Sequence, residues 1–474
     1  MLRNILLGPT YLGKKRMITR TEFLPTEALA KYQTDLLGGV LLHALEHIPF
    51  YQNVLNCRNV ASEKDILTRL SYFPIIDKKT IRMQCEAFMK ASLFRQLKAT
   101  SGGSTGQPFV FYMDRFVTRQ REKAFIFDLW GRVGYRFGDA IFNLRGRTPK
   151  KGSMVHHDRL FNIYYASSFD LNTAKIEDYI SAINRIRPRF LHGYPSTMYQ
   201  LAILMEAAKK RLQFQVTAVL CGSEKLFPYQ KTKIEKVFGC RVYHWYGHSE
   251  CLALGGACEY SDVLHFYPQY GYTELLPAGV TDDRGRELFE IVATGFNNPV
   301  MPLLRYRTGD YAVLAETQSC RCGRNYLLID EIVGRQQEFI VDVNGYLISA
   351  TSLIFGQHYE AFGDIASIKL HQQKIGAITV ILVKGKDFRE ELYWKMQNHM
   401  RELIGDRMTI NFKFSDAVEK TPIGKAKLVE QELDMREFLP TDYVHEKRKE
   451  IGMTNKHENN SEAKSSVCSN LPRN

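Results

Sequence analysis

The chain has 474 residues, of which 45% are hydrophobic and 24% are charged. This is the composition of an ordinary globular protein, and it excludes disordered and fibrous classes. A chain of this length exceeds the size at which a single core keeps growing, so we expect at least two domains. The net charge of +13 suits nucleotides, CoA, an acidic polysaccharide or nucleic acid. Nucleic acid is disfavoured, because no recognised nucleic-acid motif accompanies the charge.

The sequence offers no membrane or export signal. The apolar run in residues 1–8 is too short for a signal peptide and lacks a small-residue cleavage site. Residues 36–50 are apolar but are interrupted by His, Glu and Pro, well short of the roughly 20 residues that a membrane span needs. The nine cysteines are odd in number and scattered, unlike a secreted disulfide framework. We predict a soluble cytoplasmic protein without a membrane span, with cysteines that are reduced or bind a metal.

Residues 1–90 are expected to form helices and loops without assignable chemistry. From about residue 90 to residue 330, apolar runs alternate with helix-like stretches, an order that predicts parallel α/β layers. The runs that show this alternation are the strand-like residues 140–144, 190–191 and 218–220 and the helix-like residues 176–186 and 198–210.

A different pattern follows Gly334. Strand-like residues 365–371 and 377–383 precede a helix that Asp387 can cap, and residues 408–414 form another predicted strand. This ββαβ order predicts a small α+β domain. The sequence therefore predicts a large N-terminal α/β domain followed by a small C-terminal α+β domain and a disordered polar tail, with the boundaries 1–335, 336–445 and 446–474.

A glycine-rich segment, Thr100–Pro108, combines three glycines with four hydroxyl residues. Backbone N–H groups of such a loop can approach a phosphate closely, and the hydroxyls donate further bonds. The loop lacks the Lys of a Walker loop and leads into a predicted strand, Phe109–Tyr112, where Walker and Rossmann loops open a helix. For this loop alone, a hairpin turn is an equally good interpretation.

Four later segments carry further polar groups: Tyr246–Glu250, Tyr306–Asp310 with an Asp after a predicted turn, Gly334-Arg335, and Lys420–Lys425. In this order and spacing, the five segments resemble the adenylate-forming superfamily of acyl-CoA synthetases and adenylation domains. The resemblance is closest to the phenylacetate–CoA ligase branch with its capsular polysaccharide biosynthesis members, and it runs from about residue 75 to about residue 435.

The resemblance implies the large-plus-small-domain fold of adenylate-forming enzymes and an ATP- and Mg²⁺-dependent ligase. Such an enzyme activates a carboxylate as acyl-AMP, releases pyrophosphate, and passes the acyl group to CoA or to an amine or sugar acceptor. Lys425 is implied as the catalytic cation and Glu250 as a ligand of Mg²⁺. The implied ATP-binding residues are Ser101, Gly102, Gly103, Ser104, Thr105 and Gly106 for the triphosphate, Ser223, Glu224, Tyr246, Gly247 and Ser249 around adenine and the acyl group, and Asp310 and Arg335 for the ribose.

Two positions depart from the superfamily pattern. Ser249 replaces the common Thr, and Gln337 or Glu338 stands where many members place Asp or Lys in the hinge between the domains. We expect the small domain to rotate between two half-reactions. We also expect His192–Ser196 to line the acyl pocket, because this segment follows an apolar strand; an ordinary turn explains the segment equally well.

A second constellation combines cysteine with histidine. Cys258, His265, Cys320 and Cys322 offer the thiolate and imidazole ligands of a tetrahedral structural zinc site, with Cys251 as a spare ligand. The spacing is not that of a zinc finger, so free buried thiols remain an alternative. Phenylacetate–CoA-ligase-like proteins have a segment similar to Cys320–Arg324.

Two further interpretations of the whole chain stay open. One is an aminoacyl- or hydroxyacyl-adenylating enzyme that hands its product to a sugar or a carrier. The other is a catalytically silent nucleotide-binding member of a polysaccharide assembly system. Glu250, Asp310 and Lys425 together argue against the silent protein, because it has no physical need for all three.

Overall fold

The structure is a computed structural model, and it describes residues 7–55, 65–90, 93–101, 109–145, 153–281, 285–333, 339–355, 359, 361, 364–385, 388–416 and 428–438. The predicted disordered tail, 446–474, lies outside these residues, as does the segment 334–338 that holds the predicted domain boundary. That boundary stays a prediction. No helix in the described part of the chain is both long and apolar enough to cross a membrane.

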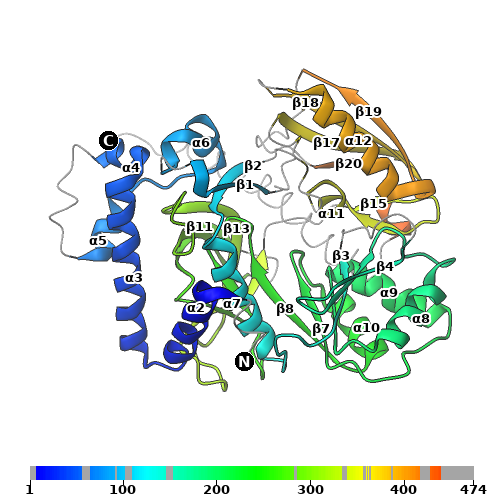
Figure 1. Ribbon diagram of the computed structural model, residues 1–474, viewed down its shortest axis with the longest axis horizontal. Coiled ribbons are helices and arrows are strands. Elements are labelled where there is room, and N and C mark those ends of the chain that lie inside the picture. Colours follow the sequence, from blue (N-terminus) through cyan, green and yellow to red (C-terminus); the bar gives the residue numbers. More distant parts are fainter. Residues whose placement is uncertain are drawn as a thin grey trace, which may run out of the picture.

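The N-terminal quarter is helical, as expected, and lies along one side of the molecule (Figure 1). Two of its short helices begin at aspartates: the carboxylate of Asp65 accepts a hydrogen bond from the Thr68 N–H, and that of Asp77 from the Thr80 N–H. The α-helices are α2 (Gly8–Thr21), α3 (Thr26–His47), α4 (Pro49–Leu55), α5 (Ile66–Ser71) and α6 (Lys78–Met83).

Among the described residues, twelve strands form one mixed sheet in the order β11-β12-β13-β14-β10-β9-β8-β7-β6-β3-β5-β4. The strands from β8 to β5 in this order are parallel, and the others join antiparallel. The strands are β3 (Ile141–Arg145), β4 (Val155–Asp158), β5 (Ile163–Ser167), β6 (Phe190–Gly193), β7 (Ala218–Gly222), β8 (Arg241–Gly247), β9 (Leu254–Gly256), β10 (Leu264–Phe266), β11 (Gly271–Thr281), β12 (Glu287–Gly295), β13 (Tyr306–Leu314) and β14 (Leu327–Val333).

Helices cover both faces of the parallel part of this sheet. Leu191 and Val219 pack in the core of α8 (Ile176–Ile186), α9 (Pro195–Ala207) and α10 (Pro228–Phe238). Their neighbours Phe190 and Ala218 pack with α7 (Thr118–Gly131) on the other face. Because successive strand residues point to opposite faces, apolar runs without polar alternation are what a sheet covered on both sides requires. The predicted α/β class is confirmed.

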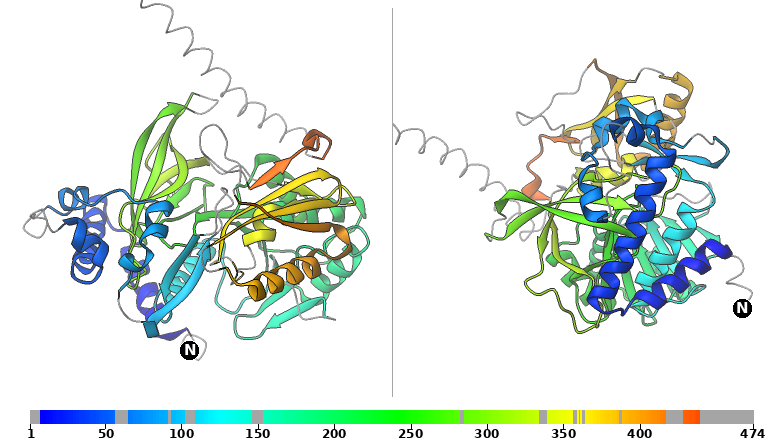
Figure 2. Two further views of the ribbon diagram at one scale, coloured as in Figure 1. Left: turned by 90° about the horizontal axis from the view of Figure 1, so that it is seen from above. Right: turned by 90° about the vertical axis from the view of Figure 1, so that its left-hand side faces the viewer.

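A smaller sheet follows, with the order β19-β18-β17-β20. Its core contains Met396 and Met400 of α12 (Glu390–Ile404), which lies against the sheet (Figures 1 and 2). The predicted helix cap Asp387 lies outside the described residues, and Arg389 stands at the N-cap. The remaining elements are β15 (Phe339–Val341), β16 (Leu347–Ser349), α11 (Ala350–Phe355), β17 (Ile365–Lys374), β18 (Ala377–Lys384), β19 (Thr409–Phe414) and β20 (Val429–Gln431).

Polar contacts join the small α+β part to the segment that follows β5 of the large sheet. The Arg407 guanidinium forms an ion pair with the fully buried Asp342 and donates a hydrogen bond to the Phe169 carbonyl. The hydroxyls of Thr173 and Tyr346 are hydrogen-bonded at 2.9 Å. These contacts hold the small sheet against the side of the large sheet that carries α8 and α9, as Figure 2 shows.

Candidate functional site

A cavity of about 560 Å³ opens at the carboxyl ends of β7 and β8. Five residues that the sequence analysis assigned to nucleotide binding line this single cavity, although they come from three separate segments: Ser223, Glu224, Tyr246, Gly247 and Asp310. Its other lining residues include Trp245, the loop Ser261–Leu264 and the strand residues Asp330–Ile332. The carboxyl ends of parallel strands are where open α/β sheets bind ligands.

Tyr246 and Asp310 are joined directly across the cavity wall. The Tyr246 hydroxyl donates a hydrogen bond of 2.9 Å to the Asp310 carboxylate, which is 3% exposed. The Asp310 N–H in turn donates to the Thr308 hydroxyl. The predicted turn before Asp310 is wrong, because Tyr306–Asp310 begins strand β13. Gly309, with φ of +78°, accommodates an irregularity in the pairing of β12 with β13 at this point.

Glu250 follows β8 and is 4% exposed. Its carboxylate accepts a hydrogen bond of 3.2 Å from the Tyr306 hydroxyl and lies 3.7 Å from the Lys78 ammonium and 3.9 Å from the His248 imidazole. A buried carboxylate is costly unless it is hydrogen-bonded and paired with a cation, and these groups provide both. The sequence analysis missed Lys78, because a single Lys at the start of a short helix gives no signal of its own.

Ser223 and Glu224 are fixed by residues from neighbouring strand ends. The Arg145 guanidinium donates a hydrogen bond of 2.6 Å to the Ser223 hydroxyl and lies 4.6 Å from the centre of the Tyr194 ring. The Glu224 carboxylate accepts a bond of 2.7 Å from the Ser196 hydroxyl. The predicted acyl-pocket segment therefore meets the nucleotide-site residues. Arg145 was not predicted, since the sequence does not reveal that β3 and β7 lie two strands apart.

His192, at the end of β6, is 5% exposed and packs between the rings of Trp130 and Trp245 at centroid distances of 5.2 and 5.7 Å. Burial lowers its pKa well below the ordinary value, so the imidazole is neutral. Its Nδ1 lies 3.0 Å from the Asn143 amide, while Nε2 has no hydrogen-bond partner among the described residues. The segment is thus a β6–α9 junction whose His points into an aromatic cluster.

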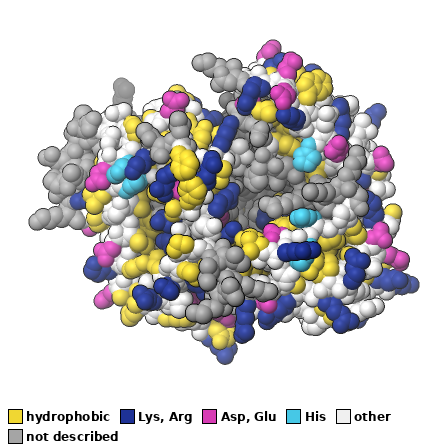
Figure 3. All heavy atoms as spheres, viewed as in Figure 1, with side chains coloured by type: hydrophobic (Ala, Val, Ile, Leu, Met, Phe, Trp, Pro, Cys, Tyr) yellow, Lys and Arg dark blue, Asp and Glu magenta, His cyan; other side chains and the backbone are white. Residues whose placement is uncertain are grey.

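The predicted phosphate loop connects two antiparallel strands, β1 (Gln96–Ser101) and β2 (Phe109–Asp114), with Ser101 opposite Phe109. This arrangement agrees with the expected strand after the loop. Outside the described residues lie Gly102, Gly103, Ser104, Thr105, Gly106, Arg335 and Lys425, so their roles stay predictions. On the face shown in Figure 3, Lys and Arg side chains are spread over both domains and do not form one stripe.

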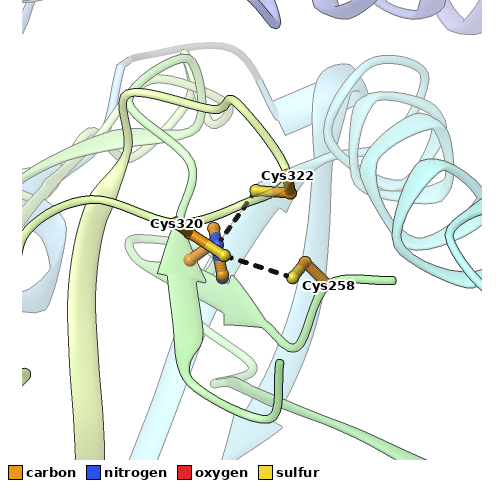
Figure 4. Close-up of side chains that lie close together, drawn as sticks. Cys258, Cys320 and Cys322 are labelled. Carbon is orange, nitrogen blue, oxygen red and sulfur yellow. Dashed lines mark hydrogen bonds between the residues drawn. The ribbon is translucent and has the colours of Figure 1, made fainter. Parts of the chain in front are cut away.

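The four predicted zinc ligands converge although they come from two distant segments. The sulfur and nitrogen atoms of Cys258, His265, Cys320 and Cys322 all lie within 4.8 Å of one another. The Cys258 and Cys320 sulfurs are 3.6 Å apart, and the Cys322 sulfur is 3.3 Å from the His265 Nε2 (Figure 4). The edge of a tetrahedron with metal–sulfur bonds of zinc length is about 3.8 Å. The spacing therefore fits one tetrahedral ion.

Neighbouring groups prepare these side chains for a cation. The backbone N–H groups of Tyr260 and Ser261 point at the Cys258 sulfur at 3.3 and 3.2 Å, a pattern that stabilises a thiolate. The His265 Nδ1 bonds the Val263 carbonyl at 2.8 Å, which leaves Nε2 as a lone-pair donor. Burial lowers the His265 pKa to about 4 and, together with the other thiols, raises the Cys320 pKa to about 11.

Cys251, the proposed spare ligand, is separate from this cluster. It is 1% exposed, and its thiol donates to the Ser249 carbonyl at 3.4 Å. In the part of the chain that the structure describes, Cys258, His265, Cys320 and Cys322 form the one group of three or more potential metal-ligating side chains.

Sequence comparison finds relatives along most of the chain. Protein CapK of Staphylococcus aureus is 23% identical over 387 residues, which cover 80% of this chain and 84% of that protein. The phenylacetate-coenzyme A ligase of Thermus thermophilus is 25% identical over 342 residues, covering 68% of this chain and 73% of that enzyme. The chain is a homologue of these proteins. No protein-family profile matches this homologue of the phenylacetate–CoA ligases.

Structure comparison agrees with the sequence relatives. A 2-hydroxyisobutyryl-CoA ligase in complex with 2-HIB-AMP and CoA superposes with a TM-score of 0.54 at 16% identity, covering 88% of this chain and 93% of that enzyme. At this identity the likeness concerns the fold. This homologue of CapK and the phenylacetate–CoA ligases thus has the fold of adenylate-forming acyl-CoA ligases, as the sequence predicted.

Proposed function

We propose that the protein is an AMP-forming ligase that activates a carboxylic acid with ATP and passes the acyl group to CoA. The observation that carries the proposal is the convergence of Ser223, Glu224, Tyr246 and Asp310 on one cavity, with the buried Glu250 four residues beyond Tyr246. Two of the five segments that carry the sequence resemblance, Tyr246–Glu250 and Tyr306–Asp310, also meet in space. The likeness in sequence to phenylacetate-coenzyme A ligases supports the same reaction.

In this proposal the cavity binds the nucleoside part of ATP. The Asp310 carboxylate accepts hydrogen bonds from the ribose hydroxyls, and Tyr246 holds Asp310 in place through its 2.9 Å bond while its ring packs against adenine. The β1–β2 loop and Arg335 complete the site on the phosphate and ribose sides. Ser223 and Glu224, fixed by Arg145 and Ser196, separate adenine from the acyl pocket.

The chemical step is in-line attack of a carboxylate oxygen on the α-phosphorus. One P–O bond forms as the bond to pyrophosphate breaks, and the products are acyl-AMP and pyrophosphate. The protein must hold the two anions together and stabilise charge on the phosphate oxygens, which is the proposed role of Lys425. Glu250 is suited to Mg²⁺, a hard cation that prefers carboxylate oxygen and neutralises phosphate charge. The Lys78 ammonium, 3.7 Å away, pairs with that carboxylate.

The Cys/His cluster is proposed to hold one structural Zn²⁺. Four protein ligands close the coordination sphere, so this ion supplies rigidity and takes no part in the reaction. Cys258, Cys320, Cys322 and His265 fit it by chemistry and by spacing.

In the second half-reaction the acyl carbon passes to the CoA thiol, and AMP leaves. The resemblance to capsular polysaccharide biosynthesis members favours work on a polysaccharide precursor as the biological setting, with an amine or sugar as the alternative acceptor.

The test is ATP–pyrophosphate exchange over a panel of aromatic, short aliphatic, hydroxy and amino acids. We expect exchange that depends on one class of acid, and Lys425→Ala should reduce its rate by a factor on the order of 10² or more while ATP still binds. Transfer from synthetic acyl-AMP to CoA should largely survive in this variant. ATP binding without exchange for any acid would favour the catalytically silent nucleotide-binding protein.

A further inference from the structure

The proposed zinc ligands enclose part of the cavity wall. Cys258 and His265 are separated by six residues, and four of those six, Ser261–Leu264, line the cavity of about 560 Å³. The other two ligands, Cys320 and Cys322, come from the loop between β13 and β14. Those two strands bear Asp310 and the lining residues Asp330–Ile332. The cluster therefore ties together two sides of the same cavity.

The lining segment Ser261–Leu264, called the wall below, lies almost entirely outside the strands of the large sheet. Within it, β10 begins only at Leu264, so Ser261–Val263 are not held by sheet hydrogen bonds. They are held at both ends by groups of the Cys/His cluster: the Ser261 N–H points at the Cys258 sulfur, and the Val263 carbonyl accepts from the His265 imidazole. Any displacement of the two ligands displaces the wall.

Two cations support the wall from outside the cluster. The Arg241 guanidinium donates to the carbonyls of Cys258 and Ser261 at 2.6 and 2.9 Å and to the Asp262 carboxylate at 2.8 Å. Lys231 pairs with the same carboxylate. Arg241 touches the wall and the backbone of one ligand without offering a metal-binding atom, because a guanidinium has no acceptor. A substitution of Arg241 therefore removes support from the wall and leaves all four ligand side chains unchanged.

We propose that occupation of the Cys/His cluster by Zn²⁺ sets the nucleotide affinity, with Cys258 and His265 acting as positioning residues for the wall Ser261–Leu264. Without the ion, three thiols and an imidazole lose the bonds that fix their separation, and the wall between them is held less rigidly. The inference rests on the proposed binding of ATP in this cavity. Coupling between two binding equilibria is reciprocal. Bound ATP must therefore raise the affinity for zinc by the same factor by which bound zinc raises the affinity for ATP.

The experiment measures three quantities on the full chain: ATP affinity by calorimetry, zinc content, and the rate of zinc transfer to a chromogenic chelator. Zinc-loaded protein is compared with protein that has been depleted and then reloaded, with far-ultraviolet circular dichroism as the check on folding. We expect depletion to weaken ATP binding about 5-fold or more, the lower end of typical coupling, and saturating ATP to slow zinc release. Reloading should restore the affinity.

Arg241→Gln provides the test that does not depend on a folded zinc-free protein. It should retain one zinc per chain and still weaken ATP binding, because the wall loses its outer support. The matched control is Arg189→Gln, which removes a surface ion pair with Asp139 away from the cavity and should change neither value. Equal ATP affinity in folded loaded and depleted protein, or wild-type affinity in Arg241→Gln, overturns the inference. Absence of ATP binding in the zinc-loaded wild type refutes the proposed function instead.

Discussion

Two potential metal-binding places among the described residues, the partly buried Cys/His cluster and the buried Glu250 carboxylate, solve different problems. At the Cys/His cluster, three thiols and an imidazole face one another within 4.8 Å. At Glu250, a single carboxylate is already balanced by the Lys78 ammonium and the Tyr306 hydroxyl. Thiolate ligands in the first arrangement require a bound ion to compensate their charge, whereas the second arrangement tolerates an ion that comes and goes with the nucleotide. One group is therefore suited to structure and the other to turnover.

The largest expected effect separates the two groups by function. Glu250→Gln keeps the size and the hydrogen bond to Tyr306 but removes the charge, so Mg²⁺ loses its protein ligand. We expect acid-dependent exchange to fall by a factor on the order of 10² or more, with unchanged zinc content and a loss of stability of about 1–2 kcal/mol, because the Lys78 ammonium loses its paired carboxylate. An unchanged rate of ATP–pyrophosphate exchange in Glu250→Gln at low Mg²⁺ would show that Mg²⁺ binds to other residues.

The second prediction concerns stability. Cys322→Ser removes one of four ligands, and because zinc-binding energy is folding energy, we expect loss of zinc together with a destabilisation of more than about 3 kcal/mol. Thermal melting and metal analysis measure both. Cys251→Ser, a buried cysteine outside the cluster, is the matched control and should retain the metal. Cys322→Ser protein that melts like the wild type and never contained zinc would remove the metal from the account.

The third prediction concerns the ion pair between Lys78 and Glu250, which Lys78→Met removes. It leaves a buried carboxylate with a hydrogen bond but without its nearest cation, so the folded protein should lose about 1–2 kcal/mol. We expect Mg²⁺ to restore more of this stability in the variant than in the wild type, because the ion takes the place of the ammonium. Urea unfolding with and without Mg²⁺ measures the difference. Equal Mg²⁺ effects on both proteins would show that Glu250 does not bind the ion.

The smallest of these effects is expected at Tyr246. Tyr246→Phe removes the hydrogen bond to Asp310 and preserves the ring, so ATP affinity should fall about 5- to 10-fold, corresponding to about 1 kcal/mol. Zinc content and the acid preference should not change. A change in acid preference without a change in ATP affinity would move Tyr246 from the nucleotide pocket to the acyl pocket.

The sequence predicted those parts of the site that depend on local chemistry. Cys320-Arg-Cys322 and Tyr246–Glu250 are contiguous, and their residue types indicate their partners, whereas most of the glycine-rich loop lies outside the described residues and its role stays a prediction. The α/β class followed from strand-like apolar runs that alternate with helix-like stretches along the chain. Local reasoning was wrong where sheet pairing decides the backbone, as at Tyr306–Asp310, where the irregular start of β13 replaced the expected turn.

Lys78 and Arg145 could not be predicted for a related reason. Each is an isolated cation in an unremarkable segment, and its partner lies 78 or more residues away in the chain, at Ser223 for Arg145 and at Glu250 for Lys78. Only the order of strands in the large sheet brings β3 and α6 to those partners. Long-range pairing of this kind leaves no periodic or spacing signal in a single sequence.

The most direct test of the central claim follows oxygen from the acid to the nucleotide. Once the exchange screen has identified an acid, that acid is supplied with ¹⁸O in its carboxylate, together with ATP, Mg²⁺ and CoA, and the AMP produced is weighed by mass spectrometry. Attack of the carboxylate on the α-phosphorus followed by transfer to CoA predicts AMP that carries one ¹⁸O atom. AMP without ¹⁸O, formed at the same rate as pyrophosphate, would show that water attacks ATP and would contradict an acyl-adenylate.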